Sequence, residues 1–191
     1  PHIMENYYPN NPTTINSSFS LLKNGLKMNN LDHVNIDAAA EHMIDSGFEK
    51  IVNDNTIMPL AKSYLLIEMS YLQPAINFDG ALHEIKEKGY FPILAHPERY
   101  VYMHNTRYKY KNIKKEGVLF QLNILSLTQF YGKEVQKMCL SLLKEKTIDF
   151  IASDIHNLKQ LKFLKEAKIN SNQLNLIRPI IERTIYNFKY N

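Results

Sequence analysis

Short apolar runs alternate with amphipathic stretches along the chain, a pattern typical of α/β proteins. Five apolar runs predict strands, and the amphipathic stretches between and after them predict helices. The strands are expected at 34–40, 64–69, 91–95, 118–123 and 148–153. The helices are expected at 15–26, 43–52, 78–85, 110–116, 135–143, 158–167 and 173–188.

Single residues refine these boundaries. Gly89 follows the stripe of helix 78–85 and is a natural left-handed residue beyond a helix end. Pro179 predicts a kink or a late start in the last helix. No repeat or flexible linker interrupts the pattern, so residues 1–191 are interpreted as one domain.

Polar side chains recur where the predicted strands end. Glu41 closes the first strand, His96 follows the third, and Asp154 and His156 follow the fifth. In a (β/α) barrel the carboxyl ends of the strands form the rim where catalytic groups gather, so this pattern favours a barrel. Barrels of this kind typically need about 250 residues, and His2 already looks like a strand-end residue, so the chain is expected to lack about two N-terminal βα units.

Composition excludes several classes of protein. Apolar residues make up 45% of the chain, which indicates a globular domain. Lys and Arg number 23 against 19 acids and form no run of five, so a nucleic-acid partner is not expected. Cys139 is the single cysteine, which fits a reducing cytoplasm. No apolar run approaches about 18 residues and the start does not resemble a signal peptide, so membrane insertion is not expected.

The polar residues at the strand ends include donors suited to a metal ion. Asp154 and His156 are two apart, so an extended backbone points both to one face. Imidazole mixed with carboxylate suits Zn, Mn or Fe, and such ions activate water for hydrolysis. The alternative is that Asp154 and His156 form a capping and hydrogen-bonding pair. The candidate metal ligands are His2, Glu41, His96, Asp154 and His156.

The segment after the third strand offers a phosphate ligand. Arg99 has a planar guanidinium that matches the oxygens of a phosphate group. Tyr100, Tyr102 and Tyr108 could flank an aromatic ring. The alternative is that Glu98 and Arg99 pair with other loop charges while the tyrosines cover the mouth of the barrel.

Other polar residues are weaker candidates. Glu41 is preferred to His42, because neighbouring strand residues point to opposite faces. Glu68 either orients a ligand histidine or is a buried hydrogen bonder at a strand end, and the second interpretation is preferred. Cys139 lies on an apolar helix stripe without the arginine of a thiol-phosphatase loop, so it is assigned to the core. Dinucleotide, P-loop and serine-hydrolase motifs do not occur in the sequence.

Taken together, these motifs resemble the PHP (polymerase and histidinol phosphatase) superfamily. They are most similar to the bacterial metal-dependent tyrosine phosphatases of capsular and exopolysaccharide operons. The matching segments are Pro1-His2, Ala40-Glu41, the run from Ile93 to Tyr100, and the run from Ser153 to Asn157, with support from 121–127 and 130–133.

The resemblance implies a distorted (β/α)7 barrel with up to three metal ions, often manganese or iron. It implies that His2, Glu41, His96, Asp154 and His156 are ligands, that Arg99 holds the substrate phosphate, and that a metal-activated hydroxide attacks phosphotyrosine. Arg99 and Asp154 are the expected catalytic residues. The implied substrate is the tyrosine-rich tail of a partner kinase. Two alternatives stay open: a small phosphate ester such as histidinol phosphate, or a non-catalytic module that docks onto a kinase or its own copies.

The sequence departs from this family at two places. The family begins with a His-x-His strand and an Asp-rich loop, and neither precedes His2. The barrel is therefore expected to be N-terminally incomplete, to bind fewer ions and to have weak or no activity. Several relatives also carry an arginine shortly after the Asp-x-His motif, where this chain has Leu161 between Lys159 and Lys162.

Overall fold

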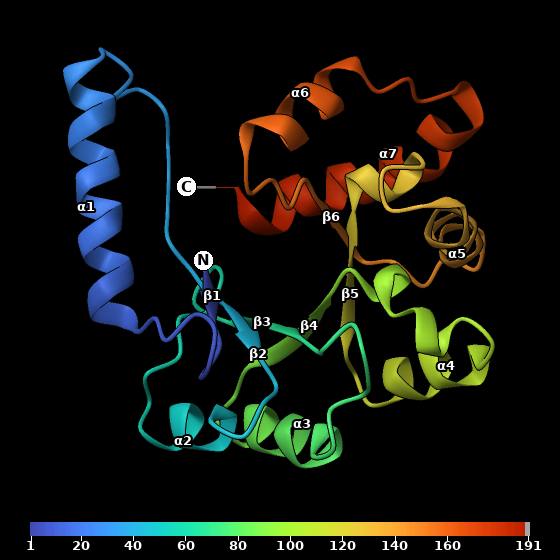
Figure 1. The fold of residues 1–191 in the computed structure, drawn as a ribbon, viewed down its shortest axis with the longest axis horizontal. Coiled ribbons are helices and arrows are strands. Elements are labelled where there is room, and N and C mark those ends of the chain that lie inside the picture. Colours follow the sequence, from blue (N-terminus) through green and yellow to red (C-terminus); the bar gives the residue numbers. More distant parts are fainter. Residues whose placement is uncertain (190–191) are drawn as a thin grey trace. The chain divides into compact units, whose positions relative to one another are not determined.

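The computed structural model describes residues 1–189. The chain divides into two compact units, which we describe separately (Figure 1). Unit 1 comprises residues 1–70 and 75–92, and unit 2 comprises residues 71–74 and 93–189. The interpretation of residues 1–191 as one domain stays a prediction.

Unit 1 contains three short parallel strands and three helices. The strands are β1 (His2–Ile3), β2 (Glu41–Met43) and β3 (Tyr64–Glu68), in the order β1-β2-β3. The helices are α1 (Pro12–Met28), α2 (Phe48–Asn53) and α3 (Phe78–Glu87). Helices α2 and α3 pack against each other, and α3 buries Ala81, Leu82 and Ile85. The residue range of unit 1 ends with the first two residues of β4 (Phe91–Ala95).

Unit 2 is built on the rest of β4 and two further parallel strands. These are β5 (Leu119–Asn123) and β6 (Phe150–Ala152), in the order β4-β5-β6. Short 3-10 turns follow two of the strands: η1 (Pro97–Arg99) and η2 (Val101–Met103) after β4, and η3 (Ile124–Leu127) after β5. The helices are α4 (Arg107–Lys115), α5 (Lys133–Lys144), α6 (Leu158–Glu166) and α7 (Ser171–Phe188).

The core of unit 2 lies between its strands and helices. Helix α5 buries its predicted apolar stripe, including Cys139, and contacts η1, η3 and α7. Helix α7 lies along β6, as Figure 1 shows, and Thr184 Oγ1 accepts the Ile151 N–H at 3.0 Å. This hydrogen bond pairs a backbone group of β6 that would otherwise need another partner.

Most of the predicted elements are confirmed. The four later strands correspond to β3, β4, β5 and β6, and the α/β class with parallel strands is correct. Gly89 has φ of 82° after α3, as predicted. Helix α7 runs through Pro179, so the predicted late start is wrong.

The predicted strand at 34–40 is also wrong. These residues form no strand, and the strand in this region, β2, begins only at Glu41. Because β2 takes up the start of the predicted helix at 43–52, the observed helix is the shorter α2. An alternating pattern is local, whereas a strand also needs a neighbour to pair with. None of the described helices combines the length and apolar character needed to cross a bilayer.

Candidate functional site

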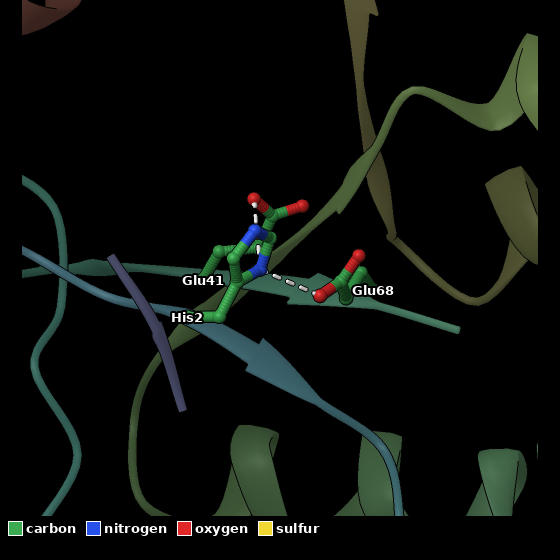
Figure 2. A group of neighbouring side chains, drawn as sticks. All are labelled: His2, Glu41 and Glu68. Carbon is green, nitrogen blue, oxygen red and sulfur yellow. Dashed lines mark hydrogen bonds and ion pairs between the residues drawn. The ribbon is translucent and has the colours of Figure 1, made fainter. Parts of the chain in front are cut away.

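Three ligand-type side chains converge in unit 1. His2 comes from β1, Glu41 from β2 and Glu68 from the end of β3, and Figure 2 shows them pointing toward one another. One ligand atom from each lies within 4.8 Å of the others, and both glutamates are buried. We call these three residues the His–Glu–Glu group.

The register of the strands explains this convergence. His2 is aligned with Glu41, and Glu68 is aligned with Met43, two residues after Glu41. Aligned residues of neighbouring parallel strands point to the same face, and so do residues two apart in one strand. The pairing therefore places all three side chains on one face.

The electrostatics of the group favour a cation. His2 Nδ1 donates to Glu68 Oε1 at 2.8 Å and lies 3.6 Å from Glu41 Oε2. The hydrogen bond to Glu68 and the charges of both glutamates raise the pKa of His2, against an opposing effect of burial. Burial makes the negative charge of a carboxylate costly unless a cation or a metal ion compensates it.

The donor set of the group fits a divalent metal ion. Imidazole with carboxylate oxygens is the combination typical of Zn, Mn and Fe sites. Among the described residues, this is the one group of three or more such donors that close together. His96, Asp154 and His156 do not form a second group of this kind in the described part of the chain.

His42 points to the opposite face of β2 and has a structural environment. It is aligned with Ile3 and Ile67 and is fully buried. The Met58 N–H donates to His42 Nε2 at 3.2 Å. In a neutral ring Nε2 is then the acceptor, so the proton is on Nδ1, which lies 3.1 Å from the Leu66 carbonyl oxygen. Burial lowers the pKa of His42 to about 4. The preference for Glu41 over His42 agrees with this placement.

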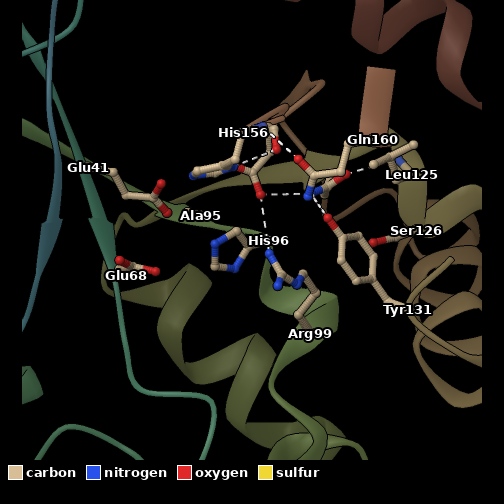
Figure 3. A network of polar contacts seen from close by, with 12 residues as sticks. Glu41, Glu68, Ala95, His96, Arg99, Leu125, Ser126, Tyr131, His156 and Gln160 are labelled. Carbon is tan, nitrogen blue, oxygen red and sulfur yellow. Dashed lines mark hydrogen bonds and ion pairs between the residues drawn. The ribbon is translucent and has the colours of Figure 1, made fainter. Parts of the chain in front are cut away.

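Unit 2 gathers a second set of candidate residues around Arg99. Arg99 donates from Nη1 to Asp154 Oδ2 at 3.2 Å, and Asn123 donates from Nδ2 to the same oxygen at 2.8 Å (Figure 3). The rings of Tyr71 and Tyr131 lie against the guanidinium, with their centroids 4.4 and 4.2 Å from Cζ. We call these five residues the arginine group.

Glu98 supports the arginine group from the protein interior. Its Oε1 accepts the Asn123 N–H at 3.0 Å and the Ser126 hydroxyl at 2.7 Å. Burial raises the pKa of Glu98, partly offset by these donors. The alternative that these residues pair with other loop charges is correct for Arg99, which pairs with Asp154 in the loop after β6. For Glu98, the hydrogen-bond partners are the two uncharged groups named above.

The backbone is strained at two of the candidate ligands. His96 has φ of 36° and Asp154 has φ of 49°, in the left-handed region, which is uncommon for residues other than glycine although His and Asp enter it more often than most. His96 also precedes Pro97, a position that normally favours extended backbone. Such conformations cost about 1–3 kcal/mol each and cluster at functional sites.

The remaining candidates are placed as follows. His96 is buried, with Nε2 3.1 Å from the Tyr71 hydroxyl. His156 is half exposed, and its Nδ1 lies 3.5 Å from Asp154 Oδ1 and 2.9 Å from the Asp154 carbonyl oxygen. Tyr100 is fully buried and donates to the Ala95 carbonyl oxygen, so it cannot flank a substrate ring.

Glu68 is a buried hydrogen bonder at the end of β3, as the preferred interpretation predicts, and its partner is the candidate ligand His2. Sequence reasoning missed two residues. Tyr71 lies in a loop after β3 and Tyr131 in the turn after η3. Neither belongs to a periodic pattern, so nothing local in the sequence identified them as neighbours of Arg99.

Comparison with known proteins identifies the family. The sequence profile of the capsular polysaccharide synthesis family CpsB/CapC matches residues 1–168. The chain belongs to this family. It is 25% identical to CapC of Staphylococcus aureus over 190 residues, which cover 99% of this chain and 74% of CapC.

Two phosphatases of the family are also similar to the chain. The tyrosine-protein phosphatase YwqE of Bacillus subtilis is 25% identical over 164 residues, covering 85% of this chain and 64% of YwqE. The tyrosine-protein phosphatase CpsB of Streptococcus agalactiae is 34% identical over 110 residues, covering 54% of this chain and 45% of CpsB. The chain thus spans less than two thirds of the length of both phosphatases.

A solved structure shows the same fold. It comes from crystallographic work on YwqE of Bacillus subtilis and CpsB of Streptococcus pneumoniae, described as metal-dependent tyrosine phosphatases. The TM-score is 0.75 with 22% sequence identity, over 96% of this chain and 79% of the other. The α/β fold of this chain therefore agrees with that of the solved structure.

Proposed function

We propose that this chain is a metal-dependent phosphatase that hydrolyses phosphotyrosine in proteins and acts in capsular polysaccharide synthesis. The observation that carries the proposal is the buried His–Glu–Glu group, found in a chain of the CpsB/CapC family. The phosphatase names of YwqE and CpsB and the metal dependence of the structural relative support the reaction.

The His–Glu–Glu group is the proposed holder of a divalent ion. Its imidazole and carboxylates supply the donors, and burial of both glutamates makes the cation favourable. A bound divalent ion lowers the pKa of water and neutralises the charge of a phosphoryl group. His96, Asp154 and His156 remain proposed ligands on the strength of the family motif.

Arg99 is the proposed ligand of the substrate phosphate. Its guanidinium presents planar N–H donors that match phosphate oxygens, and its side chain is mostly buried. Asp154 holds one edge of the guanidinium by accepting a hydrogen bond from Nη1, and Asn123 donates to the same carboxylate oxygen. These contacts orient Arg99 before a substrate arrives.

Finer features of the proposal concern the metal, the partner and the compartment. Manganese is the proposed ion, with iron and zinc as competitors for the same donors. A bacterial tyrosine kinase of polysaccharide export is the proposed substrate protein. The cytoplasm is the proposed location, because the single cysteine fits a reducing compartment.

The test combines elemental analysis with a phosphate-release assay. The purified chain is supplied with Mn²⁺, dialysed and analysed for metal, and phosphate release from phosphotyrosyl peptides is measured. At least one ion per chain is expected, with loss of metal and activity in Glu68→Gln and in the double variant Asp154→Ala/His156→Ala. Glu87→Gln is the matched control, because this exposed glutamate forms its ion pair within α3, with His83.

Two results would contradict the proposal. A chain that binds metal but hydrolyses histidinol phosphate far faster than phosphotyrosyl peptides would be a small-molecule phosphoesterase. A chain that binds no metal and releases no phosphate, yet binds a kinase unchanged after His96→Ala, would be a docking module.

A further inference from the structure

We infer that Tyr71 and Tyr131 are positioning residues that hold the guanidinium of Arg99 between their rings, ready for the phosphate group of the substrate. The inference rests on the proposed function, because Arg99 is the proposed phosphate ligand. It adds two residues of this chain to which neither the motifs nor the family assignment gives a role.

The geometry around Arg99 is that of a clamp. The ring centroids of Tyr71 and Tyr131 lie 4.4 and 4.2 Å from Arg99 Cζ, well within the range of a cation–π contact. Figure 3 shows the side chains of Arg99 and Tyr131 beside each other in this network. The carboxylate of Asp154 accepts a hydrogen bond from Nη1 of the guanidinium at 3.2 Å.

The two rings are themselves held in place by their hydroxyl groups. The Tyr131 hydroxyl accepts a hydrogen bond from Asn123 Nδ2 at 3.1 Å, and the same Nδ2 group donates to Asp154 Oδ2. The Tyr71 hydroxyl lies 3.1 Å from His96 Nε2, and its ring packs against that of Tyr100 at 6.0 Å. Fixed rings are what a clamp requires, because a mobile ring could not restrict the guanidinium.

The clamp leaves hydrogen-bonding capacity for a ligand. A guanidinium carries five N–H donors, and among the described residues the side chain of Arg99 has one hydrogen bond, to Asp154. The aromatic contacts are made by the ring faces, which do not use the strong acceptors that N–H groups seek. A phosphate monoester, or inorganic phosphate, offers oxygens for the remaining donors.

The benefit of the clamp is a reduced ordering cost. An arginine that is free in the unbound protein loses about 0.5–1.5 kcal/mol of rotamer entropy when a ligand immobilises it. If the rings already order Arg99 in the unbound protein, this entropy is lost when the chain folds and no longer opposes phosphate binding. Removing one ring should therefore weaken phosphate binding about threefold to tenfold.

The experiment compares variants that keep or remove the aromatic ring. The dissociation constants of phosphotyrosine and of inorganic phosphate are measured by calorimetry for Tyr71→Leu, Tyr131→Leu, and the Phe variants at both positions. Each Leu variant is expected to bind about threefold to tenfold more weakly. Each Phe variant keeps the ring and loses only the hydroxyl bond that fixes it, so it should bind less than about threefold more weakly. Tyr186→Leu is the matched control, since Tyr186 is exposed on α7.

A turnover measurement separates positioning from a general structural role. With Mn²⁺ present, the Leu variants should raise KM for a phosphotyrosyl peptide by the same factor and change kcat by less than about twofold. Leu variants that bind phosphotyrosine with the parental affinity would overturn the clamp. Parental and variant chains that show the expected binding pattern but no hydrolysis would overturn the proposed function and leave the clamp standing.

One further measurement does not depend on whether the Leu variants fold. In the unliganded parental chain, ¹⁵N relaxation at Arg99 Nε should give an order parameter above about 0.6, outside the range of flexible groups. Arg178, exposed on α7, is the control. An order parameter of Arg99 as low as that of Arg178 would overturn the inference.

Discussion

Replacing Glu98 with alanine is expected to lower the free energy of unfolding by about 3 kcal/mol, because two buried donors lose their acceptor. Glu98 Oε1 accepts from the Asn123 N–H and from the Ser126 hydroxyl. Glu98 and both partners are at most 1% exposed, so bulk water does not reach the donors directly.

The magnitude follows from these two hydrogen bonds. A buried donor left without a partner costs about 1–3 kcal/mol, which gives about 2–6 kcal/mol for the pair. The lower half of this range is expected, because the space left by the side chain can admit a water molecule. Glu98→Gln keeps an oxygen acceptor at the same place, so it should cost no more than about 1 kcal/mol.

Urea unfolding followed by circular dichroism gives the required comparison. The midpoint should fall in Glu98→Ala with an unchanged m-value, since the surface exposed on unfolding stays the same. Glu134→Ala is the control, because this exposed glutamate on α5 makes only a loose pair with Lys137 and should change stability by less than about 0.5 kcal/mol.

Two results would refute this reasoning. If the free energy of unfolding of Glu98→Ala stays within about 1 kcal/mol of that of the parental chain, the two hydrogen bonds stabilise the fold less than this reasoning requires. If Glu98→Gln is as harmful as Glu98→Ala, the negative charge of Glu98, and not its role as an acceptor, is what stabilises this region.

Three other predictions concern the metal group, a buried thiol and a helix end. In a thermal scan, Mn²⁺ at about 100 times its Kd should raise the Tm of the parental chain by roughly 5–10 °C. The variants His2→Ala and Glu68→Gln should show no such rise. An equal rise in these variants would mean that the ion binds elsewhere. Burial raises the pKa of Cys139 above its ordinary 9.0, so the unfolded chain ionises first and the free energy of unfolding should fall above pH 9.0, by up to about 1.4 kcal/mol per pH unit. Urea unfolding at two alkaline pH values checks this, and Cys139→Ala should show a correspondingly smaller decrease. Gly89→Ala should cost about 1 kcal/mol because Gly89 has φ of 82° with open space around it, and Gly89→Asn should cost less; equal stability of the parental chain and Gly89→Ala would contradict the strain argument.

The sequence alone determined the local elements and the chemistry of the candidate residues. Apolar runs and stripes located the later strands and most helices, because burial of one face leaves a periodic signal in the chain. Gly89 was assigned correctly because a left-handed helix end has a strong residue preference. The family was also readable, since its motifs are short runs of neighbouring residues.

Tertiary structure decided which side chains meet. Glu68 joins His2 and Glu41 because β2 and β3 pair in one particular register, and a shift of one residue would send Glu68 to the other face. The predicted strand at 34–40 failed for a related reason: alternation is a property of the segment itself, whereas pairing depends on neighbours brought in by distant parts of the chain.

The surroundings of Arg99 illustrate the same division. Its guanidinium could be assigned to phosphate from residue type, because the donor geometry belongs to the side chain itself. Tyr71 and Tyr131 are 28 and 32 positions away from it in the sequence and carry no pattern that predicts the contact. Chemistry is encoded residue by residue, but the orientation that makes it usable comes from contacts between segments that only the folded chain brings together.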